Sequence, residues 1–135
     1  WGVSPLRDKG AYMEFMPINL TKHIGSPFHA HLNNDCQYDE ELPLKLDYDI
    51  TLSVLNRYRR VLRFNAYYFM RANNLRGGCS EMRTLTRERD QFRSLQQKWG
   101  RRIVCRNGGE SRQKSRRGEK IQDTSPILKV PIGGV

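Results

Sequence analysis

Arginine and aromatic side chains alternate along residues 55–78, which run LNRYRRVLRFNAYYFMRANNLRGG. A guanidinium can donate two parallel hydrogen bonds to a phosphate, and an aromatic ring beside it, here Phe64 or Tyr67, can stack on an unpaired base. Because positions 50–72 hold five arginines and no carboxylate, nothing within this stretch can pair them. We therefore expect RNA phosphates to contact these arginines: Arg57, Arg59, Arg60, Arg63 and Arg71.

A second set of basic residues follows towards the C-terminal end of the sequence. They alternate with small polar residues and glycine, so several cations can approach a phosphate backbone and release its counterions. The alternative is a charged solubilising segment, but the apolar residues at 127–132 favour a segment that crosses a polyanion and docks beyond it. The RNA-contacting candidates here are Arg101, Arg102, Arg106, Arg112, Lys114, Arg116, Arg117 and Lys120.

The overall charge also points to a polyanionic partner. The 135 residues carry 24 Lys or Arg against 14 Asp or Glu, a net charge of +10. The charge is uneven along the chain, because residues 1–46 carry −2 whereas residues 47–100 and 101–120 carry +6 each. A mean hydropathy of −0.76 is low for a self-sufficient core, so part of the chain is expected to pack on neighbouring proteins.

Metal binding and catalysis are both weakly indicated. His29, His31 and Cys36, with His23, could supply zinc ligands, but no paired CxxC or HxxxH spacing accompanies them. The sequence has no glycine-rich phosphate loop and no nucleophile elbow. We therefore predict no metal, no cofactor, no small-molecule substrate and no enzymatic activity. Three widely spaced cysteines favour a reducing compartment.

Long extended arms are expected at both ends of the chain. Prolines and glycines interrupt residues 1–46, so this arm should lay apolar side chains such as Phe15 and Met16 over a neighbour. Residues 101–135 form a tail that is first basic and then apolar and interrupted by prolines. Within this tail, residues 102–106 predict a short strand before the Asn-Gly-Gly turn sequence.

A helical hairpin is expected between the arms, over residues 47–100. Asp47 or Asp49 suits the start of the first helix, and the glycines at 77–78 end it. The second helix is predicted from about Ser80 to Trp99, with Gly100 as its cap. The residues expected to pack the hairpin are Tyr58, Tyr68 and Phe69 against Phe92 and Trp99. The predicted fold class is therefore mainly α, a two-helix antiparallel hairpin with long extended N- and C-terminal arms.

The segment RYRRVLR, with Phe92 about thirty residues downstream, resembles the core motif of the LYR-motif family. Its members are small mitochondrial helical proteins that serve as subunits or assembly factors of respiratory complexes and often bind acyl carrier protein. Tyr58, Arg59, Leu62 and Arg63 match the motif, but Arg57 stands where the family has leucine. The resemblance implies an alternative function, an accessory subunit or assembly factor of a mitochondrial respiratory complex.

We expect a structural, RNA-binding component of a ribonucleoprotein, namely a mitochondrial ribosomal protein. Its partners would be rRNA phosphates and neighbouring proteins of a large assembly. The chain begins at Trp1 and no signal-like apolar stretch follows, which favours an imported protein of the mitochondrial matrix with its presequence removed. No run of eighteen apolar residues occurs, so no membrane span is expected.

Overall fold

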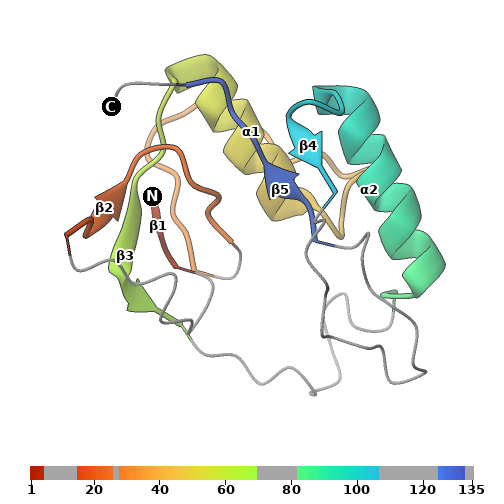
Figure 1. Cartoon of the computed structure of the whole chain (residues 1–135), viewed down its shortest axis with the longest axis horizontal. Helices are drawn as coiled ribbons and strands as arrows, with labels where there is room; N and C mark the ends of the chain where they lie inside the picture. The colour runs from red at the N-terminus through yellow and green to blue at the C-terminus, as the bar shows by residue number, and fades with distance from the viewer. Residues whose placement is uncertain (5–14, 26–27, 70–81, 107–124, 133–135) are drawn as a thin grey trace. The chain divides into compact units, whose positions relative to one another are not determined.

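The computed structural model describes residues 1–4, 15–25, 28–69, 82–106 and 125–132 (Figure 1). The chain divides into two compact units. The first unit consists of Trp1–Asp39, Leu46–Leu75 and Ile132–Val135, and the second of Glu40–Lys45 and Arg76–Pro131. The described residues form two helices and five short strands, and these strands make two small sheets.

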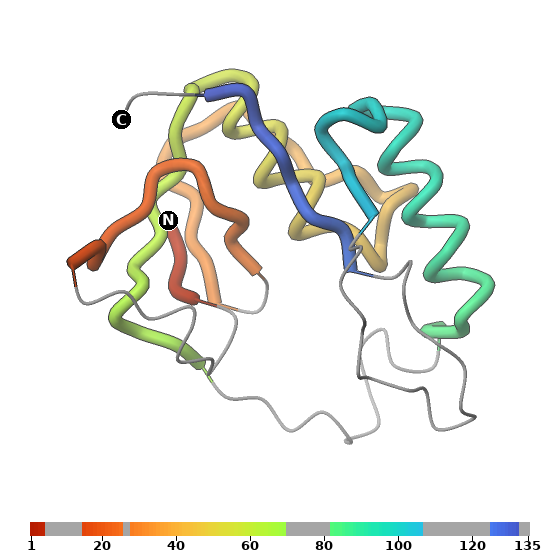
Figure 2. Tube along the Cα trace, viewed as in Figure 1, coloured from red at the N-terminus to blue at the C-terminus, as the bar shows by residue number. Residues whose placement is uncertain are grey.

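The first unit is built on a three-stranded sheet with strand order β1-β3-β2. The central strand β3 (Arg63–Tyr68) pairs in parallel with β1 (Gly2–Ser4) and antiparallel with β2 (Ile18–Asn19) (Figure 2). Phe64 is opposite Val3 on one side and Ile18 on the other. Residues from the predicted N-terminal arm therefore flank a strand that lies about 45 residues after β2 and about 60 after β1.

Helix α1 (Leu46–Tyr58) precedes this strand and begins close to the predicted position, with Asp47 and Asp49 in its first turn. The helix ends far earlier than predicted. Arg59 still donates its backbone N–H to the Leu55 carbonyl at 3.0 Å, but its φ of 61° is left-handed, so the helix cannot continue.

The prediction of a mainly α hairpin is therefore wrong, and the described fold is mixed α/β. The predicted helix would have included residues 63–68, which form β3 instead. Phe64, Tyr67 and Tyr68 have high strand propensity, and β1 and β2 supply backbone partners that no helix could use. The prediction that Tyr58 and Tyr68 pack inside the hairpin is wrong as well, because Tyr58 is 40% and Tyr68 50% exposed.

The second unit contains helix α2 (Leu85–Trp99), which begins five residues later than predicted and is capped at both ends. The Thr84 hydroxyl accepts a hydrogen bond from the Arg87 backbone N–H at 3.2 Å. Gly100, with φ of 88°, donates its N–H to the Gln96 carbonyl, so the cap predicted at Gly100 is confirmed.

The core of the second unit lies on one side of α2. Phe92 and Leu95 are buried together with Leu42, Leu44 and Val104. Val104 belongs to β4 (Val104–Cys105), which pairs antiparallel with β5 (Ile127–Leu128). The short strand predicted within residues 102–106 is thus confirmed. Neither described helix combines the length and the apolar composition that a membrane span requires.

Candidate nucleic-acid interface

A polar groove of about 850 Å³ lies in the second unit, beside the end of α2. We call it the α2–β4 groove. Helix α2 supplies its residues at one-turn spacing, and the turn after Gly100 and strand β4 supply the rest. The lining residues are Arg93, Gln96, Gln97, Arg101, Cys105 and Arg106. Three guanidinium groups and two amides therefore border one concave surface.

Backbone hydrogen bonds hold the turn that carries the groove arginines. The N–H groups of Ile103 and Val104 both donate to the Gly100 carbonyl, at 3.1 and 3.0 Å. The Gln96 side-chain amide donates to the Val104 carbonyl at 2.7 Å and so fastens β4 to α2. The Cys105 thiol donates weakly to the carbonyls of the two arginines before it, at 3.5–3.6 Å. The backbone from Gly100 to Cys105 is thus fixed before any ligand arrives.

Positive charge predominates in the second unit. Its described residues, 40–45, 82–106 and 125–131, carry ten Lys or Arg and four Asp or Glu, a net charge of +6. The two carboxylates of α2 have basic partners within the unit. Glu88 is buried against Lys45 and lies 3.2 Å from Arg83, and Asp90 lies 3.3 Å from Arg93.

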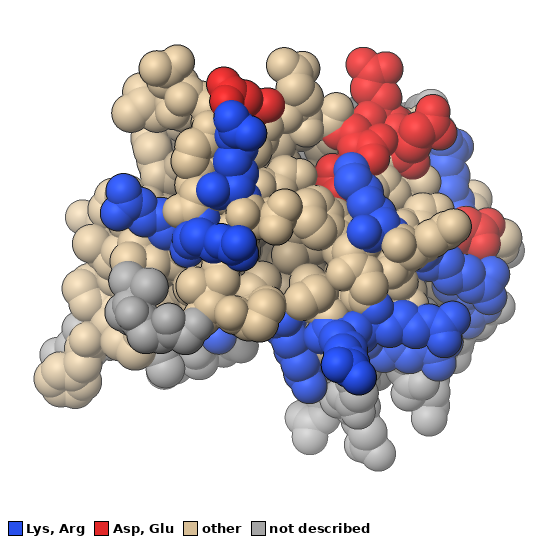
Figure 3. Space-filling view, turned by 90° about the horizontal axis from the view of Figure 1, so that it is seen from above, with Lys and Arg blue, Asp and Glu red and all other residues tan. Residues whose placement is uncertain are grey.

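Several arginines of the second unit have no acidic partner among the described residues: Arg87, Arg89, Arg101 and Arg102. All four side chains are exposed to solvent. In the space-filling view, lysine and arginine side chains gather in patches, and aspartate and glutamate side chains form smaller groups, some of which lie against lysine or arginine (Figure 3). The second unit therefore offers cations that its own carboxylates do not neutralise.

The arginines of the first unit differ from the sequence expectation. Arg57 forms an exposed ion pair with Asp35, and Arg63 donates to the Asn65 side chain at 2.8 Å and to the His23 carbonyl at 3.2 Å. Burial lowers the pKa of the Arg63 guanidinium from its ordinary value. Arg57 thus has a carboxylate partner from another segment of the chain, whereas the groups that hold Arg63 are neutral and supply no counter-charge.

The remaining predicted RNA-contacting residues fall into two groups. Arg59 and Arg60 are exposed and have no ion pair among the described residues, and Arg101, Arg102 and Arg106 are also exposed. The other candidates lie outside the described residues: Arg71, Arg112, Lys114, Arg116, Arg117 and Lys120. Sequence reasoning missed Arg93, Gln96, Gln97 and Cys105, although the spacing of 93, 96 and 97 on a helix could have placed them on one face.

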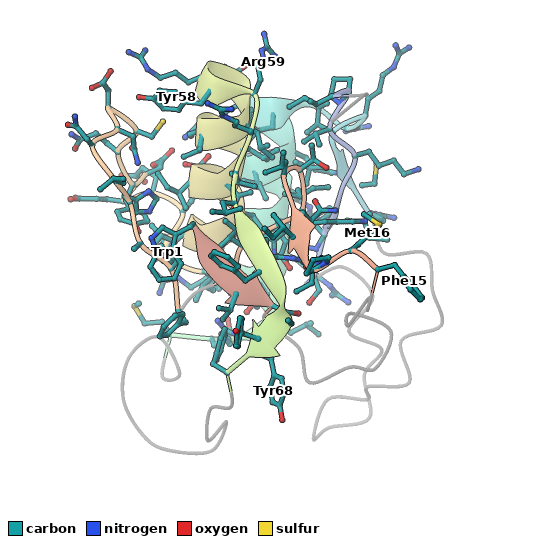
Figure 4. All side chains as sticks on the ribbon, turned by 90° about the vertical axis from the view of Figure 1, so that its left-hand side faces the viewer. Trp1, Phe15, Met16, Tyr58, Arg59 and Tyr68 are labelled. Carbon is teal, nitrogen blue, oxygen red and sulfur yellow. The ribbon has the colours of Figure 1, made fainter. Side chains whose placement is uncertain are left out.

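An aromatic pocket of about 370 Å³ lies in the first unit, and we call it the β3 pocket. Its lining residues are Trp1, Val3, Phe28, Phe64, Tyr67, Tyr68 and Phe69. Trp1 meets Phe28 and Phe64 edge to face, with ring centroids 6.0 and 6.1 Å apart, and Phe64 meets Tyr67 in the same way. Figure 4 shows Trp1 beside the sheet and Tyr68 near the end of β3. The rings predicted to stack on a base, Phe64 and Tyr67, thus share one pocket.

The histidines proposed as weak zinc ligands form a hydrogen-bonded chain instead. His29 Nε2 lies 2.5 Å and His31 Nε2 3.0 Å from the Tyr38 hydroxyl. The Asn34 Oδ1 accepts a hydrogen bond from the backbone N–H of Cys36. The Nδ2 of Asn34 therefore faces His31 and donates a hydrogen bond to His31 Nδ1 at 3.0 Å. His31 therefore carries its proton on Nε2 and donates to Tyr38, whose hydroxyl donates to His29.

This arrangement does not suit a metal. Both ring nitrogens of His31 already have hydrogen-bond partners, Asn34 at Nδ1 and Tyr38 at Nε2. In the described part of the chain, no three His, Cys, Asp or Glu side chains are grouped so that they could hold a metal ion. His23, the fourth candidate, stacks on Tyr48 with a centroid distance of 4.1 Å.

Comparison with known proteins gives no relative: no protein-family model, no curated protein and no solved structure matches the chain. The backbone positions of the residues that match the LYR motif can be compared with the single helix that the resemblance implies. Tyr58 is the last residue of α1, Arg59 is left-handed and Arg63 lies in β3. The matching residues therefore do not follow one another on a single helix.

Proposed function

We propose that this protein is a structural, RNA-binding component of a ribonucleoprotein. The observation that carries the proposal is the α2–β4 groove, where arginines from a helix and from a fixed turn border one concave surface. The two carboxylates of α2 already have basic partners: Glu88 pairs with Lys45 and Arg83, and Asp90 pairs with Arg93 of the groove. The cations available in this region therefore suit an external polyanion.

The chemistry of the groove suits phosphate groups. An arginine fork can donate two hydrogen bonds to one phosphate, and Arg101 offers an exposed guanidinium with no acidic partner among the described residues. Arg93, which is paired with Asp90, and Arg106 border the same groove. Gln97 adds an exposed amide donor beside them. Such contacts fix a protein on an RNA backbone, whereas they carry little sequence information. We propose that this groove positions the protein on the RNA backbone and does not recognise a particular base sequence.

The proposed host is a large assembly in which neighbouring proteins cover part of this chain. Phe15 is 93% exposed, and Met16 and Ile18 are each 45% exposed around the edge strand β2 (Figure 4). Apolar side chains exposed together favour packing on another protein.

The finer proposal, a ribosomal protein of mitochondria, is tested by fractionation. Co-sedimentation with mitochondrial ribosomes that is lost after nuclease treatment supports it, and migration with a respiratory complex contradicts it.

Cys105 provides a direct test of the groove, because its thiol lines it. In a chain with Cys36→Ser and Cys79→Ser, we expect a synthetic RNA hairpin to slow maleimide labelling of Cys105, and added salt to reverse the protection. Arg93→Glu with Arg101→Glu should abolish the protection. Lys22→Glu with Lys129→Glu is the matched control, since it makes the same charge change at exposed residues that line neither the groove nor the aromatic pocket of the first unit. Equal labelling with and without RNA would contradict the proposal.

A further inference from the structure

The β3 pocket has a lining that suits a flat aromatic ligand. Six of its seven lining residues are aromatic, and none is charged. All three ring contacts within it are edge to face, so no stacked pair of rings fills it. Tyr67 is 65% exposed, so a ligand can reach its ring from solvent.

Two cations stand at the start of the segment that leads into this pocket. Arg59 and Arg60 are exposed, without an ion pair among the described residues, and precede β3. Three residues separate Arg60 from Phe64, so their Cα atoms are at most about 14 Å apart. Figure 4 shows Arg59 and Tyr68 near opposite ends of this segment. A short single strand of RNA can reach from these cations to the pocket.

We propose that the β3 pocket takes an unpaired base of RNA, with the adjacent phosphates held by Arg59 and Arg60. This inference rests on the RNA-binding function proposed above and adds a second contact of a different kind. Single-stranded nucleic acid is held by stacking on aromatic rings combined with backbone contacts to cations. An apolar side chain from a protein would use neither the two cations nor the Tyr67 hydroxyl at the pocket's exposed side.

The test compares two RNA strands of equal charge, a nine-nucleotide single strand and the same strand with three abasic nucleotides at its centre. The full chain should bind the intact strand at least about fivefold more tightly, as expected for stacking of one base. Tyr67→Ala should remove this difference. Phe15→Ala, which changes an exposed ring of the same unit outside the pocket, should leave it unchanged.

Fluorescence supplies a second measurement. In a Trp99→Phe chain the emission comes from Trp1, which lines the pocket, so the intact strand should quench it more than the abasic strand. Equal affinity and equal quenching for the two strands would overturn the inference and leave the pocket to another occupant, such as an apolar side chain of a protein. If both strands bind equally and only the groove variant Arg93→Glu with Arg101→Glu weakens them, the proposed function stands without this contact. If neither strand binds, both proposals fail.

Discussion

Gln96 and Val104 are joined by a hydrogen bond of 2.7 Å from the side-chain amide to the backbone carbonyl. Gln96 lies in the last turns of α2 and lines the groove, whereas Val104 is fully buried in β4. The bond therefore connects the stability of the second unit to the shape of its basic surface, because Arg101 lies on the turn between the two residues.

Gln96→Met tests this connection. The change keeps much of the side-chain volume but removes the donor to the Val104 carbonyl, so the free energy of unfolding should fall by about 1–3 kcal/mol. Chemical denaturation measures the loss. Gln97→Met is the matched control, since Gln97 is exposed and borders the same groove. Equal stability of the two variants would show that the amide does not support β4.

The salt dependence of RNA binding should report on the groove arginines. Each phosphate contact that is lost lowers the slope of log affinity against log salt by roughly 0.7–0.9. Arg101→Gln with Arg106→Gln should therefore reduce the slope by about 1.5 and weaken binding to unrelated RNA sequences to a similar degree. Lys22→Gln, at an exposed residue of the first unit, should leave the slope unchanged. A slope that is unaltered in the double variant would exclude these contacts.

The stability of the first unit should fall on acidification. Desolvation lowers the pKa of His29 and His31 from the ordinary value of 6.5, and the charge of His29 lowers that of His31 further. Asp47 opposes the shift at His29. Because the folded pKa values lie below the unfolded ones, the unfolded chain binds more protons as the pH falls through about 6.5, and the free energy of unfolding decreases there.

The measurement is the free energy of unfolding at pH values between about 7.5 and 5.5. His29→Asn with His31→Asn should flatten the dependence over this window, because the groups with lowered pKa are gone. Tyr38→Phe should retain the two imidazoles and lose only their shared hydrogen-bond partner. Stability that rises as the pH falls in the unsubstituted chain would contradict the assignment of the shifts.

Arg59 should be replaceable by glycine with a gain in stability. Its φ of 61° is left-handed, a conformation that costs a residue with a Cβ about 1 kcal/mol relative to glycine. Arg59→Gly should raise the free energy of unfolding by up to about 1 kcal/mol, measured by chemical denaturation. Arg60→Gly, whose φ is not positive, serves as the control and should bring no gain. A loss of stability in Arg59→Gly would show that the side chain makes a necessary contact.

The sequence predicted the second helix better than the first for a physical reason. In α2 the apolar period and the Gly100 cap agree with each other, so local signals suffice. Tyr68 and Phe69 lie seven residues after Val61 and Leu62, a helical interval, yet residues 63–68 form a strand because β1 and β2 pair with it. Strands of two and three residues leave no pattern that a sequence can show.

Of the residues in the candidate site, the sequence predicted only basic ones. Arg101 and Arg106 follow from the basic composition of the tail, and the structure puts both in the α2–β4 groove. Gln96 and Gln97 are neutral, so the charge pattern does not mark them, although their spacing from Arg93 puts them on the same face of a helix. Their roles depend on a turn that returns the chain to α2. Arg57 and Arg63 show the opposite case, since partners more than twenty residues away neutralise or fix them.

Cross-linking in the native assembly tests the central claim most directly. Particles that contain the full chain would be cross-linked between RNA and protein, digested and analysed by mass spectrometry for peptides that carry nucleotides. The account predicts cross-links to the peptides that contain Arg93, Gln97, Arg101 and Arg106, at higher yield than to residues 28–39 of the first unit. RNA cross-links confined to other peptides, or no RNA in the particle at all, would contradict it.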